Sequence, residues 1–109
     1  MKLFELYISY ISWGNDGKHR PVLVFTLRDE LAFVYAVTSQ YENKSEAIRE
    51  KYFKIDDWNY AGLDKQSYID TGSYFPVPIS ALKNRPPIGQ LSANDKQKLL
   101  EYLMKQVKA

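Results

Sequence analysis

The chain has 109 residues, enough for one ordinary domain, and 45% of them are hydrophobic, which suffices for a packed core. Its formal net charge of +2 is too small to indicate nucleic-acid binding through bulk charge, so any such binding must come from a local patch. The lack of cysteine excludes disulfide scaffolds, thiol catalysis and cysteine-based metal sites, and a single histidine excludes a histidine-rich metal site.

The N-terminal stretch lacks a signal-peptide hydrophobic region, because polar and charged residues interrupt it at Lys2, Glu5 and Ser9. No apolar run approaches the length that spans a bilayer. We therefore expect a soluble, cytoplasmic protein without membrane association, formed as a single domain over residues 1–109.

The first half of the chain contains three stretches rich in aromatic and β-branched residues, each of which predicts a strand: residues 3–12, 20–27 and 31–38. Helix is the alternative for the first, because its apolar spacing is ambiguous. Pro21 cannot donate to a ladder, so we place it at the start of the second strand. A glycine-containing loop over residues 13–17 precedes that strand, and the short turn 28–30 predicts an antiparallel hairpin of the second and third strands.

The second half predicts shorter elements. They are a mobile loop over residues 41–50 with a possible helical turn at 45–49, a strand at 51–55, one helical turn at 56–63, a strand at 67–70 and an irregular strand at 74–79. The irregularity is expected because Pro76 and Pro78 each remove a ladder donor.

The last element is an amphipathic helix. Ser92 is an N-cap candidate, and Asp95 follows three residues later as in an acidic capping box. Apolar residues then recur at helical spacing and predict one stripe that packs on the rest of the fold: Leu99, Leu100, Leu103, Met104 and Val107. The sequence predicts a mainly β (α+β) protein, a small β-barrel-like sheet followed by a C-terminal α-helix.

Polar residues gather where the second and third strands meet their loops. Lys18, His19 and Arg20 precede the second strand, and Thr38, Ser39 and Gln40 close the third. An antiparallel hairpin brings these ends to the same rim of the sheet, where a guanidinium, a hydroxyl and an imidazole are suited to hold a phosphate. The simpler alternatives are that Arg20 is a solvated cation ending a hydrophobic strand and that Thr38 hydrogen-bonds its own turn.

Four segments in this order resemble the MazF/PemK family of toxin endoribonucleases: RPVLV at residues 20–24, VTS at 37–39, AGL at 61–63 with SYI at 67–69, and IGQLS at 88–92. The resemblance spans most of the chain and implies an SH3-like β-barrel with a C-terminal helix. It also implies a homodimer that cuts single-stranded RNA without a metal or cofactor, and a cognate antitoxin protein as partner.

By this resemblance, Arg20 and Thr38 are the catalytic residues. The ribose 2′-OH would attack the adjacent phosphate, Arg20 would stabilise the growing negative charge, and the Thr38 hydroxyl would donate to the phosphate. The expected substrate-binding residues are Lys18, His19, Ser39, Gln40 and Asp70.

Many family members carry a further basic residue, often in a Gln-x-Arg arrangement, on the strand after the SYI region. Here residues 70–76 read DTGSYFP, without an arginine. Proton transfer would then fall to Asp70, His19 or another group. Two alternative functions are a non-catalytic SH3-like module that binds RNA or a protein partner, and a structural domain with a peptide groove lined by Trp13, Tyr41 and Trp58.

Overall fold

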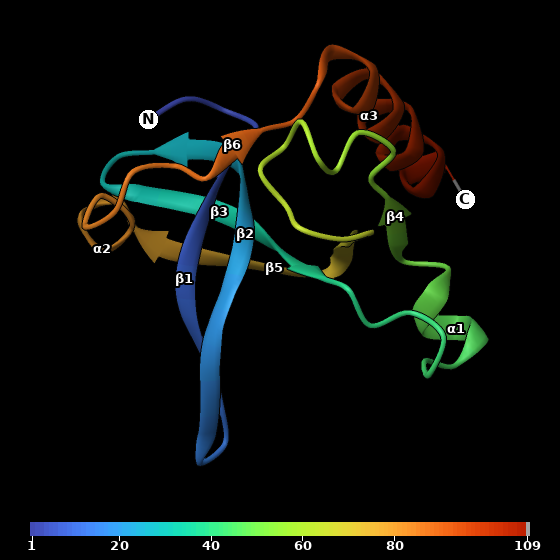
Figure 1. The fold of residues 1–109 in the computed structure, drawn as a ribbon, viewed down its shortest axis with the longest axis horizontal. Coiled ribbons are helices and arrows are strands. Elements are labelled where there is room, and N and C mark those ends of the chain that lie inside the picture. Colours follow the sequence, from blue (N-terminus) through green and yellow to red (C-terminus); the bar gives the residue numbers. More distant parts are fainter. Residues whose placement is uncertain (109) are drawn as a thin grey trace.

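The computed structural model describes residues 1–108, without the side chains of Trp13 and Lys108, so Ala109 and the predicted role of the Trp13 side chain lie outside it. An antiparallel sheet with strand order β4-β5-β3-β2-β1-β6 curls into an open half-barrel, and the C-terminal helix lies beside it (Figure 1). The elements are β1 (Glu5–Trp13), β2 (Asp16–Arg28), β3 (Leu31–Thr38), α1 (Glu46–Arg49), β4 (Tyr52–Lys54), β5 (Tyr68–Pro78), α2 (Ile79–Leu82), β6 (Gly89–Gln90) and α3 (Ala93–Lys108). This confirms the predicted mainly β fold with a C-terminal helix.

Both faces of the sheet are buried around its centre. One face packs with α3 in a cluster that includes Leu6, Leu23 and Leu99, and the other packs with α2 in a cluster that includes Tyr7, Val22 and Leu82. Side chains alternate between the two faces along a strand. The uninterrupted apolar run at residues 22–24 is therefore explained by burial on both faces, not by one buried face alone.

The strand β2 is longer than predicted. It starts at Asp16 instead of residue 20, because a tight turn at Gly14 and Asn15 replaces most of the expected loop. Gly14 has a positive φ of 57°, which glycine adopts without strain. Pro21 lies inside the strand, opposite Ile8, so the prediction that it starts the strand was wrong. A proline is tolerated there because β3 stops pairing at Val22, which leaves β2 a single neighbouring strand.

The two strands predicted at residues 67–70 and 74–79 are one strand, β5, interrupted by a bulge. Ala36 of β3 pairs with Asp70 and the preceding Tyr35 pairs with Tyr74, so residues 71–73 loop out of the ladder. The Asp70 carboxylate accepts hydrogen bonds from the Gly72 N–H at 2.9 Å and from the Ser73 hydroxyl at 2.8 Å. The carboxylate thereby holds the bulge closed from within.

The predicted hairpin of β2 and β3, the helical turn at α1 and the short strand β4 are confirmed. Residues 56–63 form hydrogen-bonded turns instead of a helix. The prediction of a strand as far as Ile79 was wrong at its end, since Ile79 begins α2. Neither α2 nor the two-residue strand β6 was predicted. No helix in the described part of the chain is long and apolar enough to cross a membrane.

The apolar stripe predicted on α3 is only partly buried. Leu99 is fully buried and Leu103 packs against the same core, whereas Leu100, Met104 and Val107 are 43%, 58% and 86% exposed. The buried face of the helix is centred one position earlier than expected, because Asp95 at its first turn points inward.

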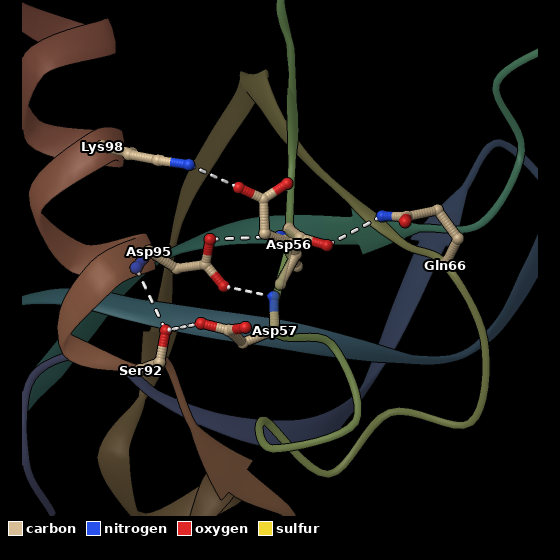
Figure 2. Close-up of polar contacts among 7 residues, drawn as sticks. Asp56, Asp57, Gln66, Ser92, Asp95 and Lys98 are labelled. Atoms are coloured by element: carbon tan, nitrogen blue, oxygen red, sulfur yellow. Dashed lines mark hydrogen bonds and ion pairs between the residues drawn. The ribbon is translucent and has the colours of Figure 1, made fainter.

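Asp95 is fully buried and ties the start of α3 to the loop after β4 (Figure 2). Its two carboxylate oxygens accept the backbone N–H groups of Asp56 at 3.1 Å and Asp57 at 2.8 Å. The Ser92 hydroxyl accepts the Asp95 N–H at 3.1 Å, which confirms the predicted N-cap, and it donates to the Asp57 carboxylate at 2.6 Å. The reciprocal half of the capping box is replaced, because the Asp95 carboxylate binds the Asp56 and Asp57 N–H groups instead of the Ser92 N–H. A buried carboxylate is stable there because backbone donors replace the water it loses.

Lys98 adds an exposed ion pair to this network, 2.7 Å from an Asp56 carboxylate oxygen. Its hydrogen bond is the main cause that lowers the pKa of Asp56 below its ordinary value. This contribution to stability is present at neutral pH and is lost as the pH falls through the lowered pKa. It is small, because both side chains are about half exposed to water.

Two glycines from the resembling segments let two backbones touch. A Cβ at Gly62, whose φ is 87°, would lie 2.0 Å from the Ile88 carbonyl oxygen, and a Cβ at Gly89 would lie 2.2 Å from the Ala61 carbonyl oxygen. Only glycine fits at either position. The contact presses the turns of residues 56–63 against the start of β6.

We expect Gly89→Ala to lower the free energy of unfolding by about 1–3 kcal/mol, because the added methyl meets backbone atoms that cannot rotate away. Urea denaturation measures the loss. Gly72→Ala is the matched control, since a Cβ there meets only side-chain atoms, Lys51 Cδ at 3.1 Å and Asp70 Oδ1 at 3.2 Å, and should cost less. Equal stability of the two variants would contradict the backbone contact.

Candidate functional site

The β1–β2 hairpin extends beyond the rest of the sheet as a two-stranded arm. Residues 8–13 of β1 pair with residues 16–21 of β2, whereas β3 pairs with β2 only as far as Val22. Figure 1 shows this arm projecting from the half-barrel. Arg20 pairs with Ser9 at the base of the arm and is half-buried. Arg20 therefore lies just beyond the end of the β2–β3 ladder, where β2 pairs with β1 and no longer with β3.

A pocket of about 1100 Å³, here called the arm pocket, lies between the arm, the second half of β5 and the segment after α2. Arg20, His19 and Asp70 line it from the side of the sheet, and Arg85 lines it from the segment between α2 and β6. Apolar residues of β5, among them Phe75 and Val77, form one of its walls. The arm pocket thus combines cationic groups with an apolar wall.

Asp70 and Tyr52 lie in one row across the sheet with Val22, which follows Arg20 by two residues. Val22 pairs with Ala36, Ala36 with Asp70, and Asp70 with Tyr52, so the row crosses four strands. Directly opposed residues in an antiparallel pair point to the same face, as do residues two apart on one strand. Arg20 therefore shares this face with Asp70 and Tyr52.

The electrostatics of the Tyr52 phenol agree with this placement. Burial raises the pKa of Tyr52 above its ordinary value, the Asp70 carboxylate raises it further, and the Arg20 guanidinium lowers it. Desolvation and a nearby negative charge both disfavour the phenolate, whereas a nearby positive charge favours it. Arg20, Asp70 and Tyr52 are close enough to form one electrostatic group.

Thr38 lies apart from the arm pocket. It pairs with Tyr68 of β5, is 9% exposed, and does not line the pocket. Its Oγ1 accepts the Gln40 N–H at 3.0 Å, as expected for a hydroxyl that hydrogen-bonds its own turn. The register of β2 and β3, continued past Val22 and Ala36, would set Arg20 opposite Thr38, but the ladder ends before that point.

The other predicted substrate-binding residues are spread along the rim. His19 follows the strand alternation away from Arg20, and its ring packs edge-on against Tyr10 with 5.3 Å between centroids. Lys18 is exposed on the arm outside the lining of the pocket. Ser39 and Gln40 follow β3, also outside that lining. The structure thus brings Arg20, His19 and Asp70 to one pocket and leaves Thr38, Lys18, Ser39 and Gln40 beside it.

An aromatic stack covers the end of β3. Tyr41 stacks on Tyr68 with 4.4 Å between centroids and 11° between planes, and the Arg49 guanidinium lies 5.0 Å from the Tyr41 ring. Arg49 also donates to the Tyr41 carbonyl at 3.1 Å. Trp58 is half-buried against the core beneath α3, so Tyr41 and Trp58 belong to different parts of the fold and line no common groove.

Sequence reasoning missed Tyr52 and Arg85. The alternation in residues 51–55 carried a signal for Tyr52, because Phe53 and Ile55 face the core and Tyr52 must then face the other side. Nothing local marked Arg85, because its place depends on how the segment after α2 returns to β1. Within residues 1–108, no three histidine, aspartate or glutamate side chains come together as metal ligands.

Removing either of the two charges near Tyr52, Asp70 or Arg20, should move the Tyr52 pKa, and the two shifts should have opposite signs. We expect Asp70→Asn to lower the Tyr52 pKa and Arg20→Gln to raise it, because each removes the charge that now acts on the phenol. NMR titration of a ¹³C-tyrosine sample measures both shifts, with Tyr52→Phe assigning the signal. A Tyr52 pKa that stays the same in both variants would contradict the arrangement.

No protein-family model matches the chain, and no curated protein matches it. Among solved structures, the chain is similar to the Mycobacterium tuberculosis toxin MazF-mt6, with a TM-score of 0.70 and 19% sequence identity. The match covers 95% of this chain and 96% of that one. The chain therefore has the fold of a MazF toxin along nearly its whole length, as the resembling segments predict.

Proposed function

We propose that this chain is a toxin of the MazF/PemK type, a metal-independent endoribonuclease that cleaves single-stranded RNA within a type II toxin–antitoxin system. The observation that carries the proposal is the arm pocket, which Arg20 and Asp70 line together on the fold of a MazF toxin. The four resembling segments support it independently, because they were identified from the sequence alone.

Arg20 is the proposed electrostatic catalyst. When the ribose 2′-OH attacks the adjacent phosphorus, the O2′–P bond forms, the P–O5′ bond breaks, and negative charge builds on the phosphoryl oxygens. A guanidinium presents several N–H donors in a fixed fork that matches these oxygens. The base of the arm holds Arg20 half-buried, where such a charge is less screened than in open solvent.

Proton transfer requires a base for the 2′-OH and an acid for the departing 5′-oxygen. Asp70 is one candidate base, since it lines the arm pocket and hydrogen bonds from Gly72 and Ser73 fix the direction of its carboxylate. His19 is the other candidate, although its ring packs against Tyr10 and points away from Arg20, so Asp70 is favoured. The products are a 2′,3′-cyclic phosphate and a 5′-hydroxyl end, and DNA is excluded because it lacks the nucleophile.

Thr38 is the second proposed catalytic residue. Its Oγ1 accepts the Gln40 N–H, and a hydroxyl that accepts one bond still has its own hydrogen to donate. The proposal has this hydrogen donated to a phosphate oxygen of RNA that extends from the arm pocket past the end of β3. Lys18, Ser39 and Gln40 are proposed to contact the RNA backbone on either side of the cleaved bond.

We expect Arg20→Ala to lower the rate of RNA cleavage in EDTA by about 100-fold or more, because it removes the main charge that stabilises the transition state. The assay measures initial rates on mixed single-stranded RNAs and identifies the new 5′ ends. Induced expression should arrest growth for the wild type and not for the variant.

Arg28→Ala is the matched control, because Arg28 is an exposed arginine on the same strand and does not line the arm pocket. It should retain wild-type cleavage. A gel shift of RNA without any product from the wild-type protein would refute the nuclease and favour the non-catalytic RNA-binding module.

The proposed partner of the arm pocket in the cell is a cognate antitoxin. Its inhibitory segment is proposed to be acidic, extended or helical, and to lie over the rim that carries Arg20. The cationic groups of the pocket support this choice of charge.

The proposed assembly is a homodimer, supported by the exposed apolar residues on α3. Leu100, Met104 and Val107 follow one another at helical spacing on one face, and a two-fold contact would cover the same face of both copies. We expect Met104→Glu to shift the protein from dimer to monomer in light scattering, with Lys105→Glu as an exposed control on another side of α3. A strictly monomeric wild type would contradict the proposal.

A further inference from the structure

The segment between α2 and β6 adds a second arginine to the lining of the arm pocket. Arg85 lines the pocket together with Asn84, whereas Arg20 enters from the base of the arm. The two arginines come from distant parts of the sequence, Arg20 from β2 and Arg85 from the segment after α2. Arg85 takes part in neither the Arg49–Glu42 nor the Lys98–Asp56 ion pair.

This segment is held firmly at both ends. Leu82, just before it, is 1% exposed in the core beneath α2. At the other end, the Ile88 N–H donates to the Leu6 carbonyl at 2.8 Å, and Pro86 and Pro87 restrict the backbone between them. Arg85 is therefore an exposed side chain on a constrained backbone, which lowers the entropic cost of binding an anion.

The contents of the pocket indicate which anion. Its volume of about 1100 Å³ exceeds the room that one small ligand takes. The same pocket has an apolar wall from β5, which includes Phe75, Pro76 and Val77. Cations at separate positions together with an apolar surface match a chain of phosphates that carries sugars and bases, as in single-stranded nucleic acid.

We propose that Arg85 binds an RNA phosphate next to the one cleaved at Arg20, with the intervening nucleotide against the β5 wall. The inference rests on the proposed function and extends it, because it assigns a binding residue outside the four resembling segments. Arg85 then contributes affinity for the RNA without taking part in the chemical step. Arg85 is thus a second basic group of the site, and it lies outside residues 70–76, which contain no arginine.

The test compares Arg85→Gln with Arg28→Gln, an exposed arginine outside the pocket. Binding of a fully 2′-O-methylated RNA oligomer, which lacks the nucleophile, is measured over a range of salt concentrations. We expect Arg85→Gln to weaken binding roughly tenfold at low salt. The slope of log affinity against log salt should fall by about 0.7, the value for one lost phosphate contact on a single strand.

Cleavage of unmodified RNA gives a second measurement. Arg85→Gln should raise KM while kcat stays near the wild-type value, because a contact made equally before and during the reaction changes only binding. A dinucleotide with a single phosphate should bind both variants equally, since it cannot reach Arg20 and Arg85 together.

The outcomes separate this inference from the proposed function. If the wild type neither binds nor cleaves RNA, the proposed function fails and this inference fails with it. If the wild type binds and cleaves while Arg85→Gln matches Arg28→Gln in slope and KM, only the role of Arg85 is overturned. Thermal melting of both variants confirms that each is folded.

Discussion

The burial of residues 22–24 on both faces of the sheet is the constraint on which the rest of the structure depends. Val22, Leu23 and Val24 have no exposed surface, yet alternate side chains belong to two different cores. A shift of β2 by one residue would exchange the sets of side chains that reach α3 and α2, so the register is strongly fixed. Arg20 precedes this run by two residues. The packing of two cores therefore determines where its guanidinium lies.

Two interactions outside the arm pocket, one polar and one steric, fix the loop after β4. The buried Asp95 carboxylate binds two backbone N–H groups of the loop after β4, and the contact of Gly62 with Gly89 seals that loop against β6. Neither lines the pocket, although Asp95, Gly62 and Gly89 lie in or beside segments through which the sequence resembles toxin nucleases. Those segments therefore maintain the fold on which the site is built, and their presence alone indicates architecture more than chemistry.

Local patterns predicted the strands, the β2–β3 hairpin and the capped C-terminal helix, because each depends on neighbours in the sequence. The errors arose where a distant partner decides the outcome. Pro21 is tolerated inside β2 because β3 has already left it, and residues 71–73 form a bulge because β3 continues to pair on both sides. Leu100 is exposed because the face of α3 that carries Asp95 and Leu99 packs on the core, where Asp95 binds the Asp56 and Asp57 N–H groups. None of these strand pairings and helix contacts can be predicted from composition or periodicity.

The same distinction applies to the candidate site. Arg20 and Asp70 could be proposed from the sequence because a family pattern and a strand end marked them. Tyr52 lies next to Asp70 because of the sheet order, and Arg85 lines the arm pocket because the segment after α2 returns past it. Both neighbours are decided by contacts between distant parts of the chain. A site assembled this way separates two tasks physically. In the proposed function, the strands carry Arg20 and Asp70, whose placement controls bond breaking, and the segment after α2 carries Arg85, which only attracts the RNA. Substrate affinity can then change at Arg85 without moving Arg20, since the two residues share the pocket but no element of secondary structure.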